Sequence, residues 1–273
     1  MQIQNKTTAP IGVFDSGVGG LTVAREIMRQ LPSENVVYFG DTARVPYGSK
    51  SKNTIIRFSR QIIRFLQTKN VKAIVIACNT ASALALDTVQ AETDIPVIGV
   101  ITPGARAAVN ETKNAKIGVV GTEATIRSET YTKVIKTYLS NATVIGKSCP
   151  LFVPLVEEGF AKHLITEQVI DIYLSEMKNT DIDTMILGCT HYPLLRSKII
   201  EYLGDRVYIV NPAYETAMDL KDILNKQEIA NTSDAPGTYE FYVSDAAEKF
   251  TRFANSILPY DVASTQYVNI EDY

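Results

Sequence analysis

Two apolar runs that each end in a cysteine constrain the fold of this chain more than any other feature. The stretch KAIVIACNT (72–80) has Cys78 at the end of its apolar run, and DTMILGCTH (183–191) has Cys189 at the matching place. Short apolar runs of this kind predict buried parallel strands, and polar residues at the carboxyl end of such a strand predict a ligand-binding loop. The two cysteines are therefore expected to face each other across one site.

The stretch ahead of each cysteine extends this similarity into a repeat. IGVFDSGVG (11–19) predicts a strand followed by a tight turn that its glycines permit, and IGVVGTEAT (117–125) echoes it at a similar distance before the second cysteine. Two such halves predict a shared cleft between lobes, a preferred position for small-ligand sites. The predicted fold class is α/β: two pseudo-symmetric α/β lobes with mostly parallel central sheets and the active site in the cleft between them.

Periodicity and turn residues predict the other elements. The loop 41–48 contains Pro and Gly, which disfavour a helix, and 101–109 is expected to cross over between the lobes. The tail is too small to form a domain alone. Strands are expected at 35–40, 97–100, 206–210 and 239–244 with an extended tail near 261–270, and helices to about 30 and at about 52–69, 80–92, 193–203, 212–225 and 246–256. The predicted lobes are 1–100 plus 212–273, a discontinuous first lobe, and 101–211 as the second.

Composition narrows the class of protein. With 273 residues, 45% hydrophobic and 21% charged, the chain is expected to be a soluble globular protein of one or two domains. A net charge of −3 without a Lys/Arg cluster argues against a nucleic-acid partner. The start lacks the long apolar region of a signal peptide and no run is long enough to span a membrane. Three widely spaced cysteines predict free thiols in a reducing cytoplasm.

The two strand-end cysteines differ from the ordinary intracellular cysteine, which is a small buried apolar side chain. That ordinary interpretation is kept for Cys149. Cys78 and Cys189 precede polar residues at predicted helix starts, where the helix N-terminus favours the thiolate and lowers the thiol pKa. Because both sides are equipped alike, the pair predicts reversible proton transfer: a thiolate removes a proton on one face and a thiol returns one on the other.

Three ionisable side chains are predicted to assist the thiols. Asp15 ends the first strand, where a carboxylate can hold a substrate ammonium group, help to deprotonate it or change the pKa of a nearby thiol. His191 lies two residues after Cys189 and can transfer a proton, and Glu157 is a weaker acid/base candidate. His163 is expected to be structural.

Polar groups on the same strand-end loops are predicted to hold substrate carboxylates. Together with backbone N–H groups they can do so without a dedicated arginine, although such residues also cap helices. An ion pair that stabilises the loop is the simpler interpretation of Asp41 and Arg44. The polar candidates are Ser16, Tyr47, Asn79, Thr80 and Thr190.

Other motif classes fit less well. The loop DSGVGG matches neither common nucleotide-binding glycine pattern. Zinc held by Cys78, Cys189 and His191 is conceivable, but Cys-Thr-His is not a usual ligand spacing. A cysteine hydrolase needs one nucleophile with a histidine partner, which leaves the second cysteine unexplained.

Five motifs in order resemble those of the bacterial glutamate racemases over about residues 11–270. They are FDSGVGGLTV, GDTARVPYG, IACNTASA, CPLFVPLVEEG and GCTHYP. The resemblance implies interconversion of L- and D-glutamate without a cofactor or metal, supplying D-glutamate for peptidoglycan, by an enzyme that forms homodimers. It further implies that the catalytic cysteines are Cys78 and Cys189.

The resemblance also assigns roles to other residues. Asp15, Glu157 and His191 match the family's assisting acid/base residues. In the family's usual assignment the first cysteine acts on the D-isomer and the second on the L-isomer. The substrate-contacting pairs of the family fall on Asp15-Ser16, Tyr47-Gly48, Asn79-Thr80 and Thr190-His191.

Two alternatives stay open at this point. Aspartate or hydantoin racemases share the two cysteines but generally lack the complete DSGVGG and PYG set. An alternative of another class is a binding or regulatory protein, because some glutamate racemases inhibit DNA gyrase. The intact thiols and polar loops favour an active enzyme.

Overall fold

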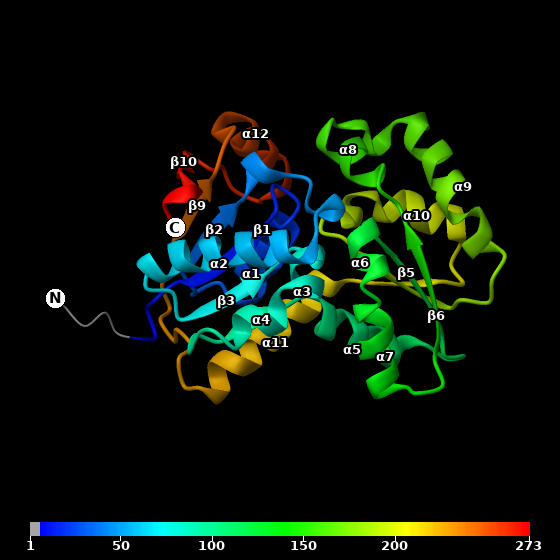
Figure 1. Cartoon of the computed structure of the whole chain (residues 1–273), viewed down its shortest axis with the longest axis horizontal. Helices are drawn as coiled ribbons and strands as arrows, with labels where there is room; N and C mark the ends of the chain where they lie inside the picture. Colours follow the sequence, from blue (N-terminus) through cyan, green and yellow to red (C-terminus); the bar gives the residue numbers. More distant parts are fainter. Residues whose placement is uncertain (1–5) are drawn as a thin grey trace.

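The computed structural model describes residues 6–273, and these fold into two α/β lobes that each contain one sheet (Figure 1). The strand order is β10-β9-β2-β1-β3-β4 in the first sheet and β6-β5-β7-β8 in the second. Every strand pairing in the described part of the chain is parallel. The predicted α/β class with two parallel-strand lobes is confirmed; residues 1–5 of the predicted first lobe lie outside the described part.

The strand bounds place the first sheet at both ends of the chain and the second in its middle. The first sheet consists of β1 (Ile11–Asp15), β2 (Val36–Gly40), β3 (Ala73–Ile76), β4 (Val97–Gly99), β9 (Tyr239–Val243) and β10 (Gln266–Tyr267). The second consists of β5 (Lys116–Gly121), β6 (Thr143–Ser148), β7 (Thr184–Gly188) and β8 (Tyr208–Val210).

The two sheets share one topology, as the repeat predicts. The order β2-β1-β3-β4 of the first lobe corresponds to β6-β5-β7-β8 of the second. Cys78 follows β3 and Cys189 follows β7, so the two cysteines occupy equivalent places. In each lobe the strand order reverses beside the first strand of the repeat, and ligands bind outside the carboxyl ends of strands at such a switch point.

Helices of both lobes cover the faces of the sheets. The α-helices are α1 (Leu21–Gln30), α2 (Lys52–Thr68), α3 (Asn79–Leu84), α4 (Leu86–Gln90), α5 (Ile101–Glu111), α6 (Glu123–Arg127), α7 (Thr130–Tyr138), α8 (Phe152–Glu157), α9 (Leu164–Lys178), α10 (Arg196–Leu203), α11 (Pro212–Lys226) and α12 (Ala247–Ile257). Single 3₁₀ turns are η1 (Thr42–Arg44), η2 (Tyr47–Ser49), η3 (Phe160–Lys162), η4 (Tyr192–Leu195) and η5 (Ile270–Asp272). No helix among residues 6–273 is long and apolar enough to cross a membrane.

Several predicted boundaries differ from the structure. The helix expected at about 80–92 is two helices, separated at Ala85. Helix α5 already begins at Ile101, with Pro103 in its first turn, because the N–H that proline lacks has no intrahelical acceptor at that position. The loop 41–48 forms two single 3₁₀ turns rather than irregular backbone, and only Gln266–Tyr267 of the extended tail pairs with the sheet.

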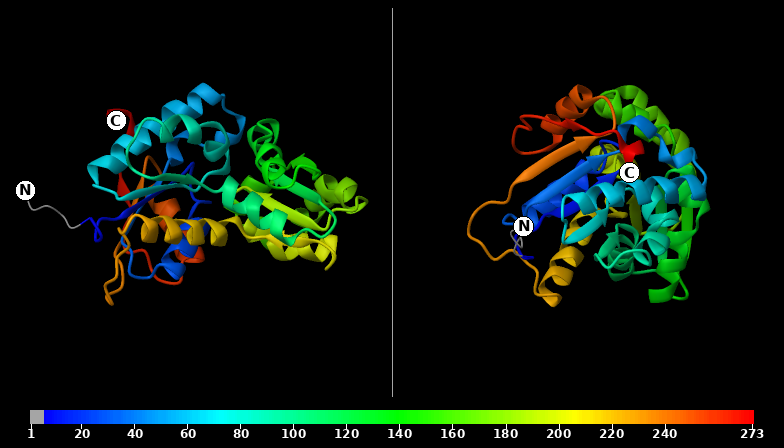
Figure 2. Two further views of the ribbon diagram at one scale, coloured as in Figure 1. Left: turned by 90° about the horizontal axis from the view of Figure 1, so that it is seen from below. Right: turned by 60° about the vertical axis from the view of Figure 1, so that its left-hand side comes forward.

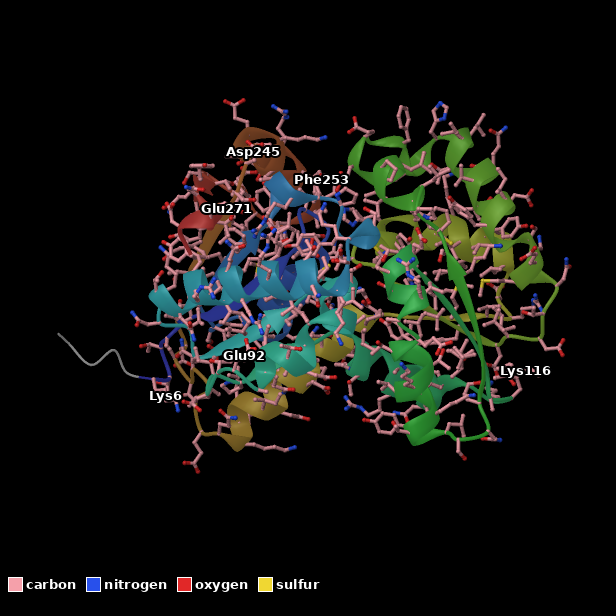
Figure 3. The ribbon with its side chains drawn as sticks, in the orientation of Figure 1. Lys6, Glu92, Lys116, Asp245, Phe253 and Glu271 are labelled. Carbon is pink, nitrogen blue, oxygen red and sulfur yellow. The ribbon has the colours of Figure 1, made fainter. Side chains whose placement is uncertain are left out.

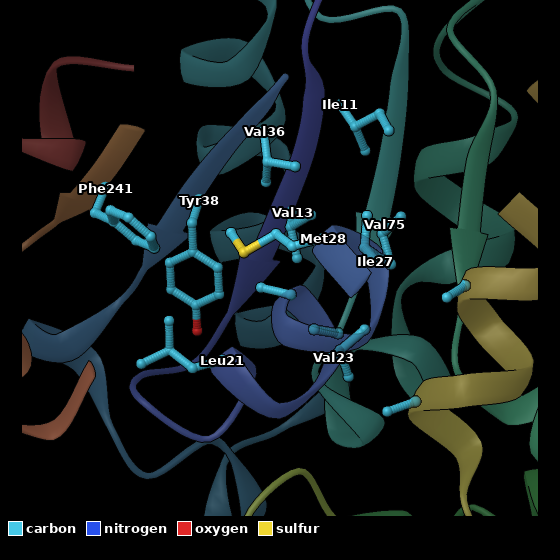
Figure 4. Close-up of a cluster of buried hydrophobic side chains, with 14 of the residues drawn as sticks. Ile11, Val13, Leu21, Val23, Ile27, Met28, Val36, Tyr38, Val75 and Phe241 are labelled. Atoms are coloured by element: carbon cyan, nitrogen blue, oxygen red, sulfur yellow. The ribbon is translucent and has the colours of Figure 1, made fainter. Parts of the chain in front are cut away.

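Alternating side chains along β1 bury both faces of the first sheet. Ile11 and Val13 point to the face that α1, α11 and α12 cover, within the cluster drawn in Figure 4. Phe14 points to the opposite face and packs with α2. A parallel strand covered by helices on both sides needs apolar residues at every position, which explains the continuous apolar run in the sequence.

Two helices join the lobes. Helix α11 packs against α1 of the first lobe and against α5, and α5 packs in turn against α7 and β7 of the second lobe. The views in Figure 2 show α11 along one side of the first lobe, continuing from the second-lobe strands. Helices α5 and α11 pack closely at Gly104, which has no side chain: a Cβ at this position would lie 3.1 Å from the Cβ of Pro212.

Candidate active site

A cavity of about 400 Å³ lies between the lobes, where the strand ends of both sheets meet. Cys78 contributes to its wall from the first lobe and Cys189 from the second. The structure therefore brings the two predicted thiols to one cavity from opposite sheets. The lining residues are Ser16, Val45, Pro46, Tyr47, Gly48, Ser49, Cys78, Asn79, Thr80, Thr122, Glu123, Pro150, Val153, Pro154, Glu157, Cys189, Thr190 and His191.

Cys78 is a buried thiol at the N-terminus of α3. Its Sγ lies 3.8 Å from the hydroxyl of Ser16, and the backbone N–H of Ala81 is directed to it. Burial, with the nearby Asp15 carboxylate as a second cause, raises the pKa of Cys78 to about 12. The predicted lowering of this pKa by the helix N-terminus is wrong, because loss of hydration outweighs the short helix. Cys78 holds its proton at neutral pH.

Cys189 lies in a row of hydrogen-bonded groups with His191 and Glu157. The Sγ of Cys189 is 3.7 Å from Nδ1 of His191, and Nε2 of the same ring is 2.9 Å from Oε1 of Glu157. Burial opposes a charge on His191, but hydrogen bonds with Cys189 and Glu157 and the charge of Asp15 raise its pKa to about 10. Both ring nitrogens of the imidazolium are donors, so one bond goes to the sulfur and one to the carboxylate.

Glu157 is the carboxylate at one end of this row of hydrogen-bonded groups. Burial alone would raise the pKa of its carboxyl, but the hydrogen bond and the charge of His191, with Lys249 nearby, lower it overall. A carboxylate behind a histidine fixes the ring orientation and favours its protonated form. The sequence named Glu157 only as a weak helper, and the structure places its side chain directly on His191.

Asp15 is fully buried below the cavity and is the one predicted site residue that does not line it. Burial raises the pKa of its carboxyl, against the opposing influence of the His191 charge and of backbone N–H groups. One of these, on Gly17, lies 3.0 Å from Oδ2, and the hydroxyl of Thr190 lies 3.4 Å from Oδ1. Asp15 is therefore not placed to hold a substrate ammonium group by direct contact. Its charge influences the site through Cys78 and His191, whose pKa values it raises.

The two thiols have different surroundings, which corrects the expectation that both sides are equipped alike. Asp15 lies beside Cys78, whereas the equivalent position of the second lobe, after the echo of the first strand, is Gly121. The second thiol has the His191–Glu157 pair in its place. Equivalent backbone positions thus carry different acid/base partners.

All the predicted polar residues line the cavity, but several of their side chains already form hydrogen bonds within the protein. The amide oxygen of Asn79 accepts a 2.7 Å hydrogen bond from Tyr131, and the hydroxyl of Thr80 lies 2.9 Å from that of Thr122. The hydroxyl of Tyr47 donates to Asp41, so this phenol is directed away from a substrate. The lining includes neither lysine nor arginine.

Close approach of the lobes depends on two glycines. A Cβ at Gly19 would lie 2.4 Å from Nδ1 of His191, and a Cβ at Gly48 would lie 2.7 Å from Cβ of Thr122. In the same region the hydroxyl of Thr22 donates a 3.0 Å hydrogen bond to the carbonyl of Thr190. The glycine-rich loop after β1 therefore serves the packing of one lobe against the catalytic loop of the other.

Sequence reasoning missed several wall residues. Thr122 and Glu123 follow β5, and the echo of the first strand could have identified them, because Thr122 aligns with Ser16 in that repeat. No comparable signal marks Val153 and Pro154 of α8, which form an apolar part of the wall. Their placement depends on how α8 packs on η4.

The remaining candidates have structural positions. His163 caps α9 by accepting from the N–H of Ile165, and Cys149 is buried in the second-lobe core. Arg44 forms the expected ion pair with Asp41. Among residues 6–273, no group of three or more His, Cys, Asp and Glu side chains is placed to hold a metal ion.

Proteins of similar sequence and structure are racemases. A family model described as Asp/Glu/hydantoin racemase matches residues 11–216. A glutamate racemase of Geobacter metallireducens is 46% identical over 261 residues, covering 96% of this chain and 97% of that protein.

Two solved structures share the whole two-lobe architecture. A glutamate racemase isoform from Bacillus anthracis superposes with a TM-score of 0.93 at 42% identity, covering 96% of this chain and 98% of that one. A glutamate racemase from Francisella tularensis, solved in complex with D-glutamate, gives a TM-score of 0.91 at 40% identity, with 98% and 100% coverage.

Proposed function

This chain belongs to the Asp/Glu/hydantoin racemase family, and we propose that it interconverts L- and D-glutamate by proton transfer at the α-carbon between two cysteines. The observation that carries the proposal is the placement of Cys78 and Cys189 at equivalent strand ends of two lobes, both lining one cavity. Inversion needs a proton to leave one face of the α-carbon and another to arrive at the opposite face, and two acid/base groups from opposing lobes meet that need.

The surroundings of the two thiols suit them to opposite roles in one direction of the reaction. Cys78, with a pKa of about 12, carries a proton that it can deliver to the α-carbon. The sulfur of Cys189 lies 3.7 Å from Nδ1 of the charged His191, which stabilises negative charge on that sulfur when it acts as the acceptor for the α-hydrogen. After one turnover the roles are exchanged: Cys189 carries the proton that it removed, and Cys78, which delivered its proton, is left as the thiolate.

The α-hydrogen of an amino acid is a very weak acid, so the site must stabilise a carbanion-like state. Asn79, Thr80 and Thr190, after β3 and β7, line the cavity, and we assign to their backbone N–H groups the task of holding the carboxylate where negative charge develops. The His191 cation adds a favourable field from the second lobe. Exclusion of water between the lobes strengthens each of these interactions.

Our choice of glutamate, among the substrates of this family, is based on similarity to known relatives. Several glutamate racemases are more than 40% identical to this chain over most of its length, and another, 40% identical, was solved with D-glutamate bound. These likenesses favour glutamate over aspartate or a hydantoin. D-Glutamate made in this way supplies peptidoglycan synthesis.

The test is circular dichroism of L- and D-glutamate with purified protein and no added cofactor, with aspartate measured in parallel. The proposal expects decay of the signal from either glutamate enantiomer towards zero and little change with aspartate. Constant signals from both glutamate enantiomers, or faster decay with aspartate, would contradict it.

We further propose that the enzyme works in the reducing cytoplasm, where its three free cysteines stay reduced. The homodimer and any inhibition of DNA gyrase rest on the sequence resemblance alone and stay predictions. Light scattering of the purified protein tests the first, and a supercoiling assay tests the second.

A further inference from the structure

One wall of the cavity is a loop of the first lobe that follows β2. Residues 45–49 of this loop line the cavity, and backbone hydrogen bonds from Arg44 N to the Asp41 carbonyl and from Lys50 N to the Tyr47 carbonyl close its two single turns. Gly48 packs on Thr122 of the other lobe. Side-chain contacts also hold this wall in position.

Ser244 forms hydrogen bonds with Asp41 and with the N–H of Ala43, and a second group of contacts centres on Arg44. Its Nε lies 3.0 and 2.7 Å from the two carboxylate oxygens of Asp41, and Asp41 accepts the hydroxyl hydrogen of Tyr47. The guanidinium also lies over the ring of Phe58, 3.9 Å from its centroid. Fixing the guanidinium of Arg44 thus fixes Asp41 and, through it, the ring and backbone of Tyr47 on the cavity wall.

Two residues from distant parts of the chain hold Arg44 from outside. Its NH1 donates to Oε1 of Gln61 at 2.6 Å and to Oε1 of Glu271 at 3.1 Å. Nε2 of Gln61 also donates a 3.1 Å hydrogen bond to Oε2 of Glu271, so Arg44, Gln61 and Glu271 each contact the other two. Gln61 belongs to α2 and is 8% exposed, whereas the Glu271 side chain, in η5 near the C-terminus, is 63% exposed (Figure 3).

The C-terminal turn is itself anchored, so it can act as a support. Ile270 is buried in the cluster that α2 forms with the sheet. The ring of Tyr273 packs edge-on against Phe65 of α2 with 5.4 Å between centroids, and Arg64 donates to the Tyr273 carbonyl. These contacts hold the turn that carries Glu271 against α2, beside Arg44.

We propose that Gln61 and Glu271 are positioning residues for substrate binding: they orient Arg44, which holds the wall formed by residues 45–49. Neither residue lines the cavity, so neither touches substrate. The predicted change in KM rests on the proposed glutamate racemisation. The predicted loosening of the loop in the variants does not depend on that reaction. Looser support of a binding wall weakens substrate binding more than it changes the chemical step, which predicts a higher KM with kcat nearly retained.

The kinetic test compares four variants with the natural protein. Glu271→Ala is expected to raise KM for both glutamate enantiomers about two- to five-fold, the range for an exposed ion pair. Gln61→Leu, which removes the nearer of the two acceptors of the buried Arg44 NH1 and leaves it with Glu271 alone, is expected to raise it about ten-fold. Both should retain kcat within about two-fold. Glu271→Gln keeps an acceptor for Arg44 and should recover most of the loss.

Asp272→Asn is the matched control, because this neighbouring carboxylate bonds Asn269 in its own turn and has no contact with Arg44. Its KM should equal that of the natural protein. Because Gln61→Leu could also lower stability, the thermal midpoint of each variant is measured alongside.

Hydrogen–deuterium exchange of the peptide that covers residues 41–50, without substrate, supplies a readout that does not need activity. Faster exchange is expected in Glu271→Ala and Gln61→Leu and not in Asp272→Asn. Unchanged exchange in the first two variants overturns the inference, whether or not the protein racemises glutamate. Normal KM values in an active protein also overturn it, whereas inactivity of the natural protein with faster exchange in the variants refutes the proposed function alone.

Discussion

Glu157 Oε1 lies 2.9 Å from Nε2 of His191, and this contact turns the opposite ring nitrogen towards Cys189. The carboxylate comes from the end of α8 and the imidazole from the loop after β7, so packing of α8 sets the acid/base row of the second lobe. The first lobe has a different arrangement, in which a buried Asp15 lies near Cys78. The two sides of the cavity therefore share one backbone arrangement but have different charged groups beside the thiol.

Replacing Glu157 by Gln tests the catalytic use of this contact. Without the carboxylate the pKa of His191 falls, and the imidazolium that supports Cys189 is less populated at neutral pH. We expect kcat/KM to fall about 10- to 100-fold. The fall must be equal in both directions, because enantiomers have equal free energies and the equilibrium constant is one. Glu158→Gln is the matched control, since this exposed neighbour pairs with Lys249 outside the cavity; equal activities of the two variants would refute the role.

The raised pKa of His191 also predicts how stability depends on pH. The folded-state pKa of about 10 lies above the ordinary value of 6.5, so the charge stabilises the fold fully below pH 6.5 and loses this contribution as pH rises through about 10. Urea unfolding of the natural protein and of His191→Asn at pH 6.5, 8 and 9.5 measures this. The stability advantage of the natural protein should shrink with rising pH. A constant difference would show that the ring is neutral throughout this range.

Each thiol is expected to be indispensable. Cys78→Ala or Cys189→Ala should lower racemisation at least about 10³-fold in both directions, because proton delivery or removal on one face is lost. Far-ultraviolet circular dichroism should show the native fold. Cys149→Ala is the control: this thiol is buried away from the cavity, so activity should stay within a few-fold. Near-normal turnover in either single-thiol variant would remove the two-thiol account.

Asp15→Asn should change the titration of Cys78. Burial is the first cause of the raised Cys78 pKa and the carboxylate charge is the second, so removing that charge should lower the pKa below about 12. The measurement is the pH dependence of iodoacetamide alkylation at Cys78, followed peptide by peptide with mass spectrometry. A Cys78 pKa that stays the same or rises in the variant would show that the Asp15 charge does not reach this sulfur.

The sequence allowed the fold and much of the site to be predicted because the signals were local. Apolar runs that end in cysteine locate β3 and β7, and the echo of IGVF locates the second lobe, whose sheet repeats the strand order of the first. The carboxyl ends of parallel strands form the ligand-binding edge of each sheet, and the repeat predicts that the two edges share one cleft, so the loop residues Asn79 and Thr190 could be placed at one site.

What the sequence left out depends on burial and on contacts between distant segments. A helix start predicts a lowered thiol pKa, but burial of Cys78 reverses the direction, and burial is a property of the assembled lobes. The phenol of Tyr47 is directed to Asp41 rather than to the cavity, which no pattern within GDTARVPYG reveals. The support of Arg44 by Glu271 joins residues at opposite ends of the chain.

Inversion of L-glutamate in D₂O, followed by NMR at low conversion, tests the central claim most directly. When the proton leaves to one thiol and arrives from the other, the new D-glutamate carries deuterium at the α-carbon while the unreacted L-glutamate keeps its hydrogen. The same result is expected in the reverse direction. D-Glutamate that retains the original α-hydrogen would show that one group carries the proton across, and would contradict the assignment of Cys78 and Cys189 to opposite faces.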